Sequence, residues 1–263
     1  MASDDFLTPA PASAPAPARV ALVLHGGGGP ATVAGLAEHL AGRGMHVLTP
    51  THPGWNGTER PEQLVDVASL AAFYLGELAT AGHRDVLLVG SSVGGWIAAE
   101  MAVRDDAGLV GGLVIVDGVG IAVDAHPIRD FFALDARGAA EYSYHDADRF
   151  YVDPASLTEE QRAQRVANMA SLRALAGDPY MHDPTLAARL AAIDVPTLVL
   201  WGESDRIVTT GYGRELAARI PGSRFELILR AGHLPHLERP EATFAALDAF
   251  AAELDVDRPR SVR

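Results

Sequence analysis

The amino-acid sequence predicts an α/β protein with a mostly parallel, doubly wound sheet and a helical insertion. Short apolar runs, of the kind found in buried parallel strands, alternate with longer stretches in which apolar residues recur at helical spacing. Such alternation favours parallel βαβ units with right-handed crossovers and helices on both faces of the sheet. One long stretch of sequence without an apolar strand interrupts this alternation of strands and helices, and it predicts the insertion.

The first strand is predicted at residues 19–24, where an uninterrupted apolar run begins after the arginine. Residues 32–41 favour a helix, and two glycines lie near its end. The next strand is predicted at residues 45–49, where Pro50 ends it because proline cannot donate a ladder hydrogen bond. These segments predict the first βαβ unit.

A long helix is predicted to begin at Pro61, because proline is favoured in the first helical turn and the apolar residues up to Leu78 fall on one face. Residues 85–89 then predict a short strand that is buried on both faces. Residues 96–102 favour a helix, and residues 109–116 predict the next strand. The βα alternation therefore continues through this point.

The predicted insertion spans residues 120–192 and divides a core of residues 19–119 and 193–256. It contains helical patches and aromatic residues: Phe131, Phe132, Tyr142, Tyr144, Phe150 and Tyr151. Strands resume at residues 195–201 and 225–229. Because it leaves and re-enters the sheet on the side where ligands bind in such folds, we interpret it as a helical cap that shapes a substrate pocket. The alternative is a set of packing helices without substrate contact.

Composition excludes several functional classes. The chain has 263 residues and 48% hydrophobic residues, but no apolar run long enough to cross a bilayer, which predicts a globular protein without a membrane span. The formal charge of -13 repels phosphate backbones and argues against nucleic-acid binding. The chain has no cysteine, which excludes disulfides and thiolate catalysis.

The first 18 residues are predicted to be an extended, mobile lead-in, because proline alternates with alanine and serine over residues 9–18. The chain starts with acidic rather than basic residues, and no apolar segment typical of a signal peptide follows. We therefore expect a cytoplasmic protein. The oligomeric state is left open.

A G-x-S-x-G pattern lies between a predicted strand and a predicted helix. Residues 89–95 read Val-Gly-Ser-Ser-Val-Gly-Gly, which places Ser92 at the centre of the pattern. A strand–turn–helix setting exposes the hydroxyl of the central serine on a strained turn, so Ser92 is the candidate nucleophile. Its neighbour Ser91 is the competing candidate.

A serine hydroxyl needs a base, and that base needs an orienting acid. Asp205 lies in a turn after the strand at residues 195–201, and His233 lies in a loop after the last strand. We expect His233 to be the base and His236, one turn further on, to be structural. Asp117 ends the strand before the insertion and is the rival to Asp205 as the acid.

The order Ser92, Asp205, His233 resembles that of the α/β-hydrolase superfamily, and the resemblance spans residues 20–254. It implies a cofactor-free serine hydrolase with a helical cap. Residues 24–29, Leu-His-Gly-Gly-Gly-Gly, resemble the oxyanion loop of the family. The resemblance implies that the backbone N–H groups of Gly27, or Gly28, and of Val93 hold the oxyanion. A phosphate-binding loop is disfavoured, because neither G-x-G-x-x-G nor a lysine after the last glycine is present.

Two departures from the family pattern stand out. Relatives commonly have an aspartate at the end of the second parallel strand, within D-x-P-G-x-G-x-S, whereas this chain has Thr-His-Pro-Gly-Trp-Asn-Gly-Thr at residues 51–58. The family also usually begins with an antiparallel strand pair, for which the proline-rich start leaves little room. We therefore expect six strands rather than eight.

Two sets of histidines have simpler roles than catalysis. His25 is expected to orient the oxyanion loop by hydrogen bonding. Three histidines of the insertion lie in sequence near aspartates, but their spacing matches no metal-ligand motif, so we expect neither a metal nor a cofactor. The residues concerned are His126, His145, His182, Asp124, Asp146 and Asp183.

The resulting hypothesis is a serine hydrolase that cleaves an ester or related small-molecule acyl substrate through Ser92, His233, Asp205 and an acyl-enzyme. One alternative is a carbon–carbon bond hydrolase or a cofactor-free haloperoxidase-like enzyme, because relatives use the same triad for those reactions. A second alternative is a receptor that keeps the fold and binds a ligand without catalysis.

Overall fold

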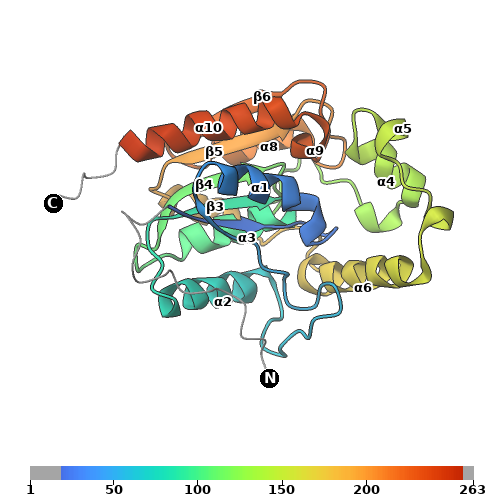
Figure 1. Cartoon of the computed structure of the whole chain (residues 1–263), viewed down its shortest axis with the longest axis horizontal. Helices are drawn as coiled ribbons and strands as arrows, with labels where there is room; N and C mark the ends of the chain where they lie inside the picture. The colour runs from blue at the N-terminus through green and yellow to red at the C-terminus, as the bar shows by residue number, and fades with distance from the viewer. Residues whose placement is uncertain (1–18, 257–263) are drawn as a thin grey trace.

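A computed structural model describes residues 19–256 as a six-stranded parallel sheet between two layers of helices (Figure 1). The strand order is β2-β1-β3-β4-β5-β6. The strands are β1 (Val20–Leu24), β2 (His46–Leu48), β3 (Val86–Ser91), β4 (Val110–Val116), β5 (Thr197–Gly202) and β6 (Arg224–Ile228). The α-helices are α1 (Ala34–Gly42), α2 (Val67–Thr80), α3 (Val93–Val103), α4 (Ala136–Ser143), α5 (Ala147–Phe150), α6 (Glu159–Ala176), α7 (Leu186–Arg189), α8 (Thr210–Ala217), α9 (Pro235–Glu238) and α10 (Pro240–Val256). Short 3-10 turns are η1 (Pro30–Val33), η2 (Phe131–Ala133), η3 (Pro154–Ser156) and η4 (Leu190–Ala192).

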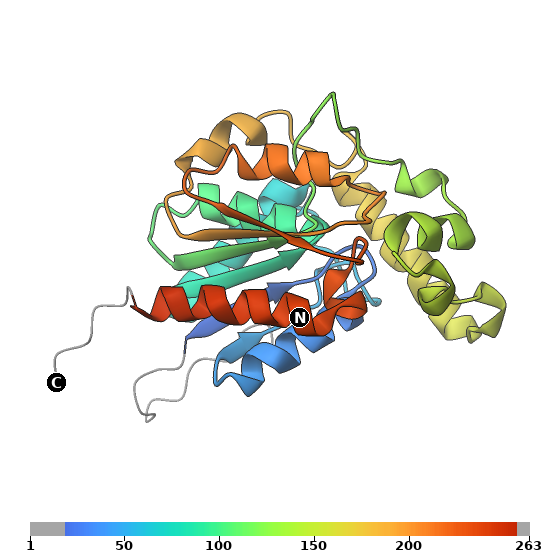
Figure 2. The same ribbon diagram turned by 90° about the horizontal axis from the view of Figure 1, so that it is seen from above.

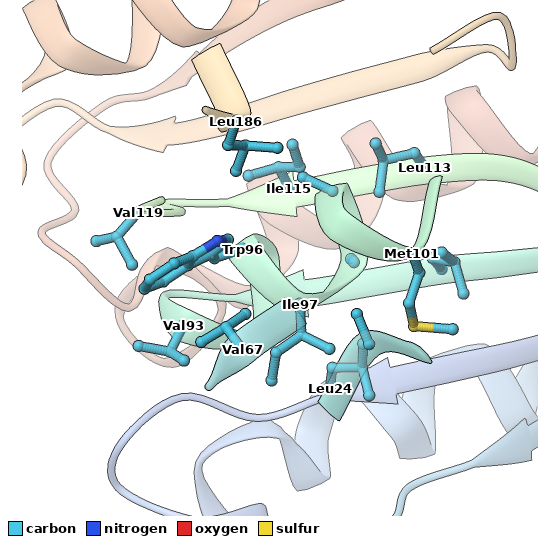
Figure 3. Packing of buried hydrophobic residues seen from close by; sticks show 14 of the residues in the cluster. Leu24, Val67, Val93, Trp96, Ile97, Met101, Leu113, Ile115, Val119 and Leu186 are labelled. Carbon is cyan, nitrogen blue, oxygen red and sulfur yellow. The ribbon is translucent and has the colours of Figure 1, made fainter. Parts of the chain in front are cut away.

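Each central strand is buried on both faces, so successive side chains belong to two different cores. Ala21 and Val23 of β1 pack with α1 and α10 on one face. Leu22 and Leu24 pack with α2 and α3 on the other. Figure 2 shows helices covering both faces of the sheet. On that second face, Trp96 and its neighbours on α3 lie over β1 and β4, close to a leucine of α7 (Figure 3). This packing explains why the strands are continuous apolar runs rather than alternating ones.

The sheet changes its winding direction between β1 and β3. From β1 the chain crosses to β2 on one side, and then returns past β1 to β3 on the other. The loops that follow β1 and β3 therefore separate at the carboxyl edge and leave a crevice, where open α/β sheets bind ligands. Both the glycine loop at residues 26–29 and Ser92 lie at this edge.

The six predicted strands are confirmed, but two helix starts were wrong. The helix predicted to begin at Pro61 begins at Val67 instead, because Asp66 and Ser69 form a reciprocal capping box at that point. Residues 61–66 form turns and bends. The helix predicted from residue 96 begins three residues earlier, at Val93, directly after Ser92.

Between β4 and β5 the chain forms helices, turns and isolated bridges but no strand, over residues 117–196. We call this segment the β4–β5 insertion. Its helices α4, α5 and α6 project beyond the carboxyl edge of the sheet (Figures 1 and 2). The predicted lead-in at residues 1–18 lies outside the described residues. Over residues 19–256, no helix combines the length and apolar composition needed to cross a membrane.

Two glycine substitutions provide a matched test of the packing. A Cβ atom at Gly94 would lie 2.1 Å from the Leu24 carbonyl oxygen, whereas a Cβ atom at Gly76, within α2, would meet nothing within 4 Å. We expect Gly76→Ala to raise the free energy of unfolding by about 0.5–1 kcal/mol, because alanine loses less backbone entropy in a helix. Gly94→Ala should lower it by more than about 2 kcal/mol, because backbone must move. Urea unfolding followed by circular dichroism measures both, and equal effects would contradict the packing described.

Candidate active site

Ser92 occupies a sharp turn between β3 and α3. Its φ of 58° lies in the left-handed region, which is strained for a residue with a side chain. The turn is possible because glycines lie two residues before and after Ser92: a Cβ atom at Gly90 would lie 2.1 Å from the Gly94 carbonyl oxygen. The Ser92 amide donates to the Val116 carbonyl at 3.0 Å, which ties the turn to β4. The local sequence therefore forces the Ser92 side chain out at the carboxyl edge of the sheet.

The structure brings together the three residues that the sequence predicted for catalysis. The Ser92 hydroxyl lies 3.0 Å from His233 Nε2, and His233 Nδ1 lies 2.7 Å from Asp205 Oδ2. The other carboxylate oxygen of Asp205 accepts the amides of Ile207 and Val208 at 2.8 and 3.0 Å. Asp205 is thus held as an acceptor behind the imidazole, the geometry in which a histidine can take a proton from serine.

The rival candidates occupy different positions. Ser91 is the last residue of β3 and is buried, and its hydroxyl has no hydrogen-bond partner among the described residues. Asp117 follows β4 and accepts the Gly202 amide at 2.9 Å. His236 is buried and bonds the Thr32 carbonyl at 2.8 Å. None of these side chains makes the serine–histidine or histidine–carboxylate contact.

The glycine loop after β1 lies against the serine turn. A Cβ atom at Gly26 would lie 2.9 Å from the Ser92 Cβ atom, so only glycine permits this approach. Gly27 and Val93 both line the cavity beside Ser92. Within residues 19–256, no backbone hydrogen bond engages either of their amides. The two N–H groups predicted to hold an oxyanion are therefore unpaired beside the serine hydroxyl.

The cavity above Ser92 has a volume of about 360 Å³. The β4–β5 insertion supplies much of its apolar wall, including Phe131, Tyr144 and Met169. Among the described residues that line it, Arg165 of α6 is the only one with a permanent charge. The cavity is therefore suited to a small, largely apolar molecule with a negative group.

Comparison with known proteins agrees with this geometry. A model of the alpha/beta hydrolase family matches residues 21–247. The chain belongs to this family. It is 29% identical over 243 residues to a 2-hydroxy-6-oxononadienedioate/2-hydroxy-6-oxononatrienedioate hydrolase of Pseudomonas putida, covering 85% of this chain and 84% of that protein. A similar hydrolase of Cupriavidus pinatubonensis is 29% identical over 246 residues, covering 86% of this chain and 84% of that protein.

Solved structures share the fold at lower identity. A meta-cleavage product hydrolase from Pseudomonas fluorescens has a TM-score of 0.74 at 18% identity, covering 90% of this chain and 92% of that one. An esterase from Exiguobacterium antarcticum has a TM-score of 0.71 at 19% identity, covering 89% and 92%. The family match and the named relatives together identify this alpha/beta hydrolase as an enzyme.

His25 bonds the glycine loop, as the sequence predicted, but the buried network that extends from it to His52 and Tyr74 was missed at the level of sequence. The His52 amide donates to His25 Nε2 at 3.0 Å, so the His25 proton lies on Nδ1 and is donated to the Gly26 carbonyl at 2.7 Å. His52 Nε2 donates to the His25 carbonyl at 2.9 Å, and His52 Nδ1 accepts the Tyr74 hydroxyl at 2.7 Å. Each ring has one donor and one acceptor in use, so the network requires both histidines to be neutral. The departure from the family pattern at residues 51–58 was the available signal.

Glu238 was also missed, because its partners come from distant segments. It is buried, and its carboxylate accepts the amides of His145, Asp146 and Gly232. The adjacent His233 amide donates to the Ser143 carbonyl at 2.6 Å. Residues 143–146 of the β4–β5 insertion are thus hydrogen bonded to the loop that carries His233 and to Glu238, which follows it.

The histidines and aspartates of the insertion make other contacts. His145 bonds the Ser204 hydroxyl, His182 bonds the Tyr180 carbonyl, and Asp183 pairs with Arg189. In the described part of the chain, the one cluster of three with atoms close enough to share an ion is Asp117, Asp205 and His233. Two of these already bond each other within the triad arrangement.

The buried histidines predict a loss of stability in acid. Burial lowers the pKa of His25 and of His236 from 6.5 to about 4, and it lowers the pKa of His52 well below 6.5. The unfolded chain therefore binds more protons than the folded one between about pH 6.5 and 4. The free energy of unfolding should fall as the pH is lowered through this range, by on the order of 3 kcal/mol for each fully shifted histidine.

The contribution of one buried histidine to this pH dependence of the free energy of unfolding can be measured with His236→Gln. Glutamine retains a donor for the Thr32 carbonyl but does not titrate. This variant should show a shallower dependence on pH than the wild type in urea unfolding between pH 7 and 4. His126→Gln, the same replacement at a partly buried position, is the control. A wild-type stability that is flat over this range would contradict the assignment of neutral buried rings.

Proposed function

We propose that this enzyme hydrolyses its substrate through Ser92, His233 and Asp205. The observation that supports this most directly is the continuous hydrogen-bond chain from the Ser92 hydroxyl through the imidazole to the Asp205 carboxylate. In this proposal His233 takes the serine proton while Ser92 Oγ adds to a carbonyl carbon. Asp205 stabilises the imidazolium that forms. Water then hydrolyses the acyl-enzyme, with His233 as its base.

The Gly27 and Val93 amides are proposed to bind the tetrahedral oxyanion. Both donors are unpaired within the described structure and lie beside Ser92, on a loop and a helix terminus that are fixed by packing. Donors that are oriented before the reaction stabilise the developing charge without reorganising. The β4–β5 insertion is proposed to act as the cap that shapes the pocket, since its residues form much of the cavity wall.

The bond to be broken is proposed to be a carbon–carbon bond rather than an ester. The curated relatives are named for 2-hydroxy-6-oxo dienedioates and trienedioates. Such compounds have ketone, enol and carboxylate groups but no ester, so a hydrolase of this type must break a carbon–carbon bond. For this bond to break, the 2-hydroxy diene must first tautomerise to its 2-oxo form, which moves the enol proton to C5. Serine addition to the 6-oxo carbon then lets C5 depart as a dienolate conjugated with the 2-oxo group, and this dienolate accepts the His233 proton. Arg165 offers a counter-charge for a substrate carboxylate in the otherwise apolar cavity.

Ester cleavage is the second candidate, because the same nucleophile, base and oxyanion donors suit an ester carbonyl. The two candidates are separated by measuring kcat/KM for a 2-hydroxy-6-oxo dienoic acid and for acyl esters of graded chain length. We expect the dienoic acid to be the better substrate. A preference for neutral esters, with no turnover of the dienoic acid, would favour the ester hydrolase.

The nucleophile is tested with two adjacent serines. Ser92→Ala should lower kcat by roughly a thousandfold or more, because the residual rate comes only from binding and the oxyanion donors. Ser91→Ala is the matched control and should retain most of the activity, because the Ser91 hydroxyl is buried and faces no reacting group. A fluorophosphonate probe should label the wild type and Ser91→Ala but not Ser92→Ala. Equal labelling of the wild type and Ser92→Ala would refute the assignment.

The role of Arg165 is tested by removing its charge. Arg165→Gln should raise KM for the dienoic acid by about tenfold or more, since an ion pair at the substrate carboxylate is lost. KM for a neutral ester should change little. Arg84→Gln, which removes a charge remote from the cavity, is the control. A similar rise in KM for acidic and neutral substrates would show that Arg165 shapes the pocket without recognising charge.

A further inference from the structure

A second carboxyl group lies behind the Asp205–His233 pair. Asp117 directly follows β4, Asp205 follows the adjacent strand β5, and a polar side-chain atom from each of Asp117, Asp205 and His233 lies within 4.8 Å of the others. The Asp117 side chain is 0% exposed. Its backbone has a φ of 45°, in the strained left-handed region, and its amide donates to the Leu200 carbonyl at 3.0 Å. The fold therefore holds this side chain in place at a local backbone cost.

The two carboxyl groups have unequal hydrogen-bonding environments. Asp205 accepts two backbone amides through Oδ1 and the His233 ring through Oδ2, so each of its oxygens has a donor. Asp117 accepts only the Gly202 amide, through Oδ1. Asp117 Oδ2 is buried and accepts no hydrogen bond from any residue in the described range. An ionised Asp117 would leave this oxygen without a donor.

Electrostatics points the same way. Two buried carboxyl groups this close cannot both be ionised without a large repulsion, so they share one proton. Burial raises the pKa of Asp117 well above its ordinary value, and the nearby charges of Asp205 and Glu238 raise it further. The Gly202 amide opposes this rise, but burial outweighs it. His233 is the remaining titratable group that faces the pair, and its ring proton is donated to Asp205.

We propose that Asp117 is a neutral positioning residue whose carboxyl O–H donates a hydrogen bond to the Asp205 carboxylate. This bond gives Asp205 a fourth donor, after Ile207, Val208 and His233. Four donors fix the Asp205 carboxylate in place behind the imidazole, where it can stabilise the imidazolium. A neutral Asp117 also adds no second negative charge beside His233.

This inference rests on the proposed triad for its catalytic consequence, and three substitutions test it. Asp117→Asn replaces the carboxyl O–H by an amide N–H₂ of nearly the same shape, and the amide oxygen still accepts from Gly202. We expect kcat within about twofold of the wild type and an unshifted acid limb of the kcat/KM pH profile. Asp117→Leu cannot donate, and kcat should fall by about ten- to a hundredfold with little change in KM. Asp205→Asn, in contrast, should lower kcat by about ten-thousandfold.

Three outcomes would overturn the proposal. If Asp117 were ionised, its replacement by asparagine would remove a negative charge and move the acid limb to lower pH. Equal kcat for well-folded Asp117→Asn and Asp117→Leu variants would show that no donated hydrogen bond is needed. Loss of activity in Asp117→Asn, with activity retained in Asp205→Asn, would make Asp117 the triad acid. Circular dichroism and urea unfolding of each variant separate these outcomes from a loss of fold.

An infrared measurement tests the proton on Asp117 independently of catalysis. At neutral pH, the difference spectrum between the wild type and Asp117→Asn should contain the carbonyl stretch of a protonated carboxylic acid. The absence of that band would overturn the proposal even in an active enzyme. If Ser92→Ala turned out to be fully active, the proposed function would fail, whereas the infrared band would still report the protonation of Asp117.

Discussion

The structure depends on the close approach of the β1 loop, the β3 turn and the start of α3. Gly26, Gly90 and Gly94 lie so close to neighbouring atoms that a Cβ atom at any of them would fall within 2.9 Å of another residue, and at Gly90 and Gly94 the nearest atom is backbone. This contact brings the amides of Gly27 and Val93, which are unpaired within residues 19–256, beside the Ser92 hydroxyl. These groups can come together because the three glycines have no side chains that would hold the segments apart.

Adjacent strands then supply the remaining groups in spatial order. The serine follows β3, Asp117 follows β4, Asp205 follows β5 and His233 follows β6. In a parallel sheet all these carboxyl ends meet at one edge, so residues separated by more than a hundred positions in sequence become neighbours. The sheet is buried on both faces by two separate apolar cores. A rigid, doubly covered sheet holds the polar groups at distances that hydrogen bonding can use.

The sequence was most informative where local chemistry decides the structure. Short, largely apolar runs predicted all six strands, and the glycine–serine pattern predicted the turn at Ser92, because both signals lie within a few adjacent residues. The start of α2 was predicted too early, since proline at residue 61 is compatible with a helix but the Asp66 capping box lies further on. The His52–Tyr74 contact and the role of Glu238 could not be predicted. Each joins segments that are brought together only by the fold, and neither has a spacing signature.

The hydrogen bonds of Glu238 and Ser143 have a consequence for exchanging parts between relatives. The His233 amide is satisfied by a carbonyl of the β4–β5 insertion, and a single carboxylate bonds amides on both sides of that junction. The insertion is consequently not a separable module, although it is continuous in sequence. A chimera that receives a foreign insertion must retain residues 143–146, or supply an equivalent acceptor and equivalent donors, because otherwise the loop that carries His233 would lose its anchor and the buried Glu238 would lose two of the three backbone amides that bond it.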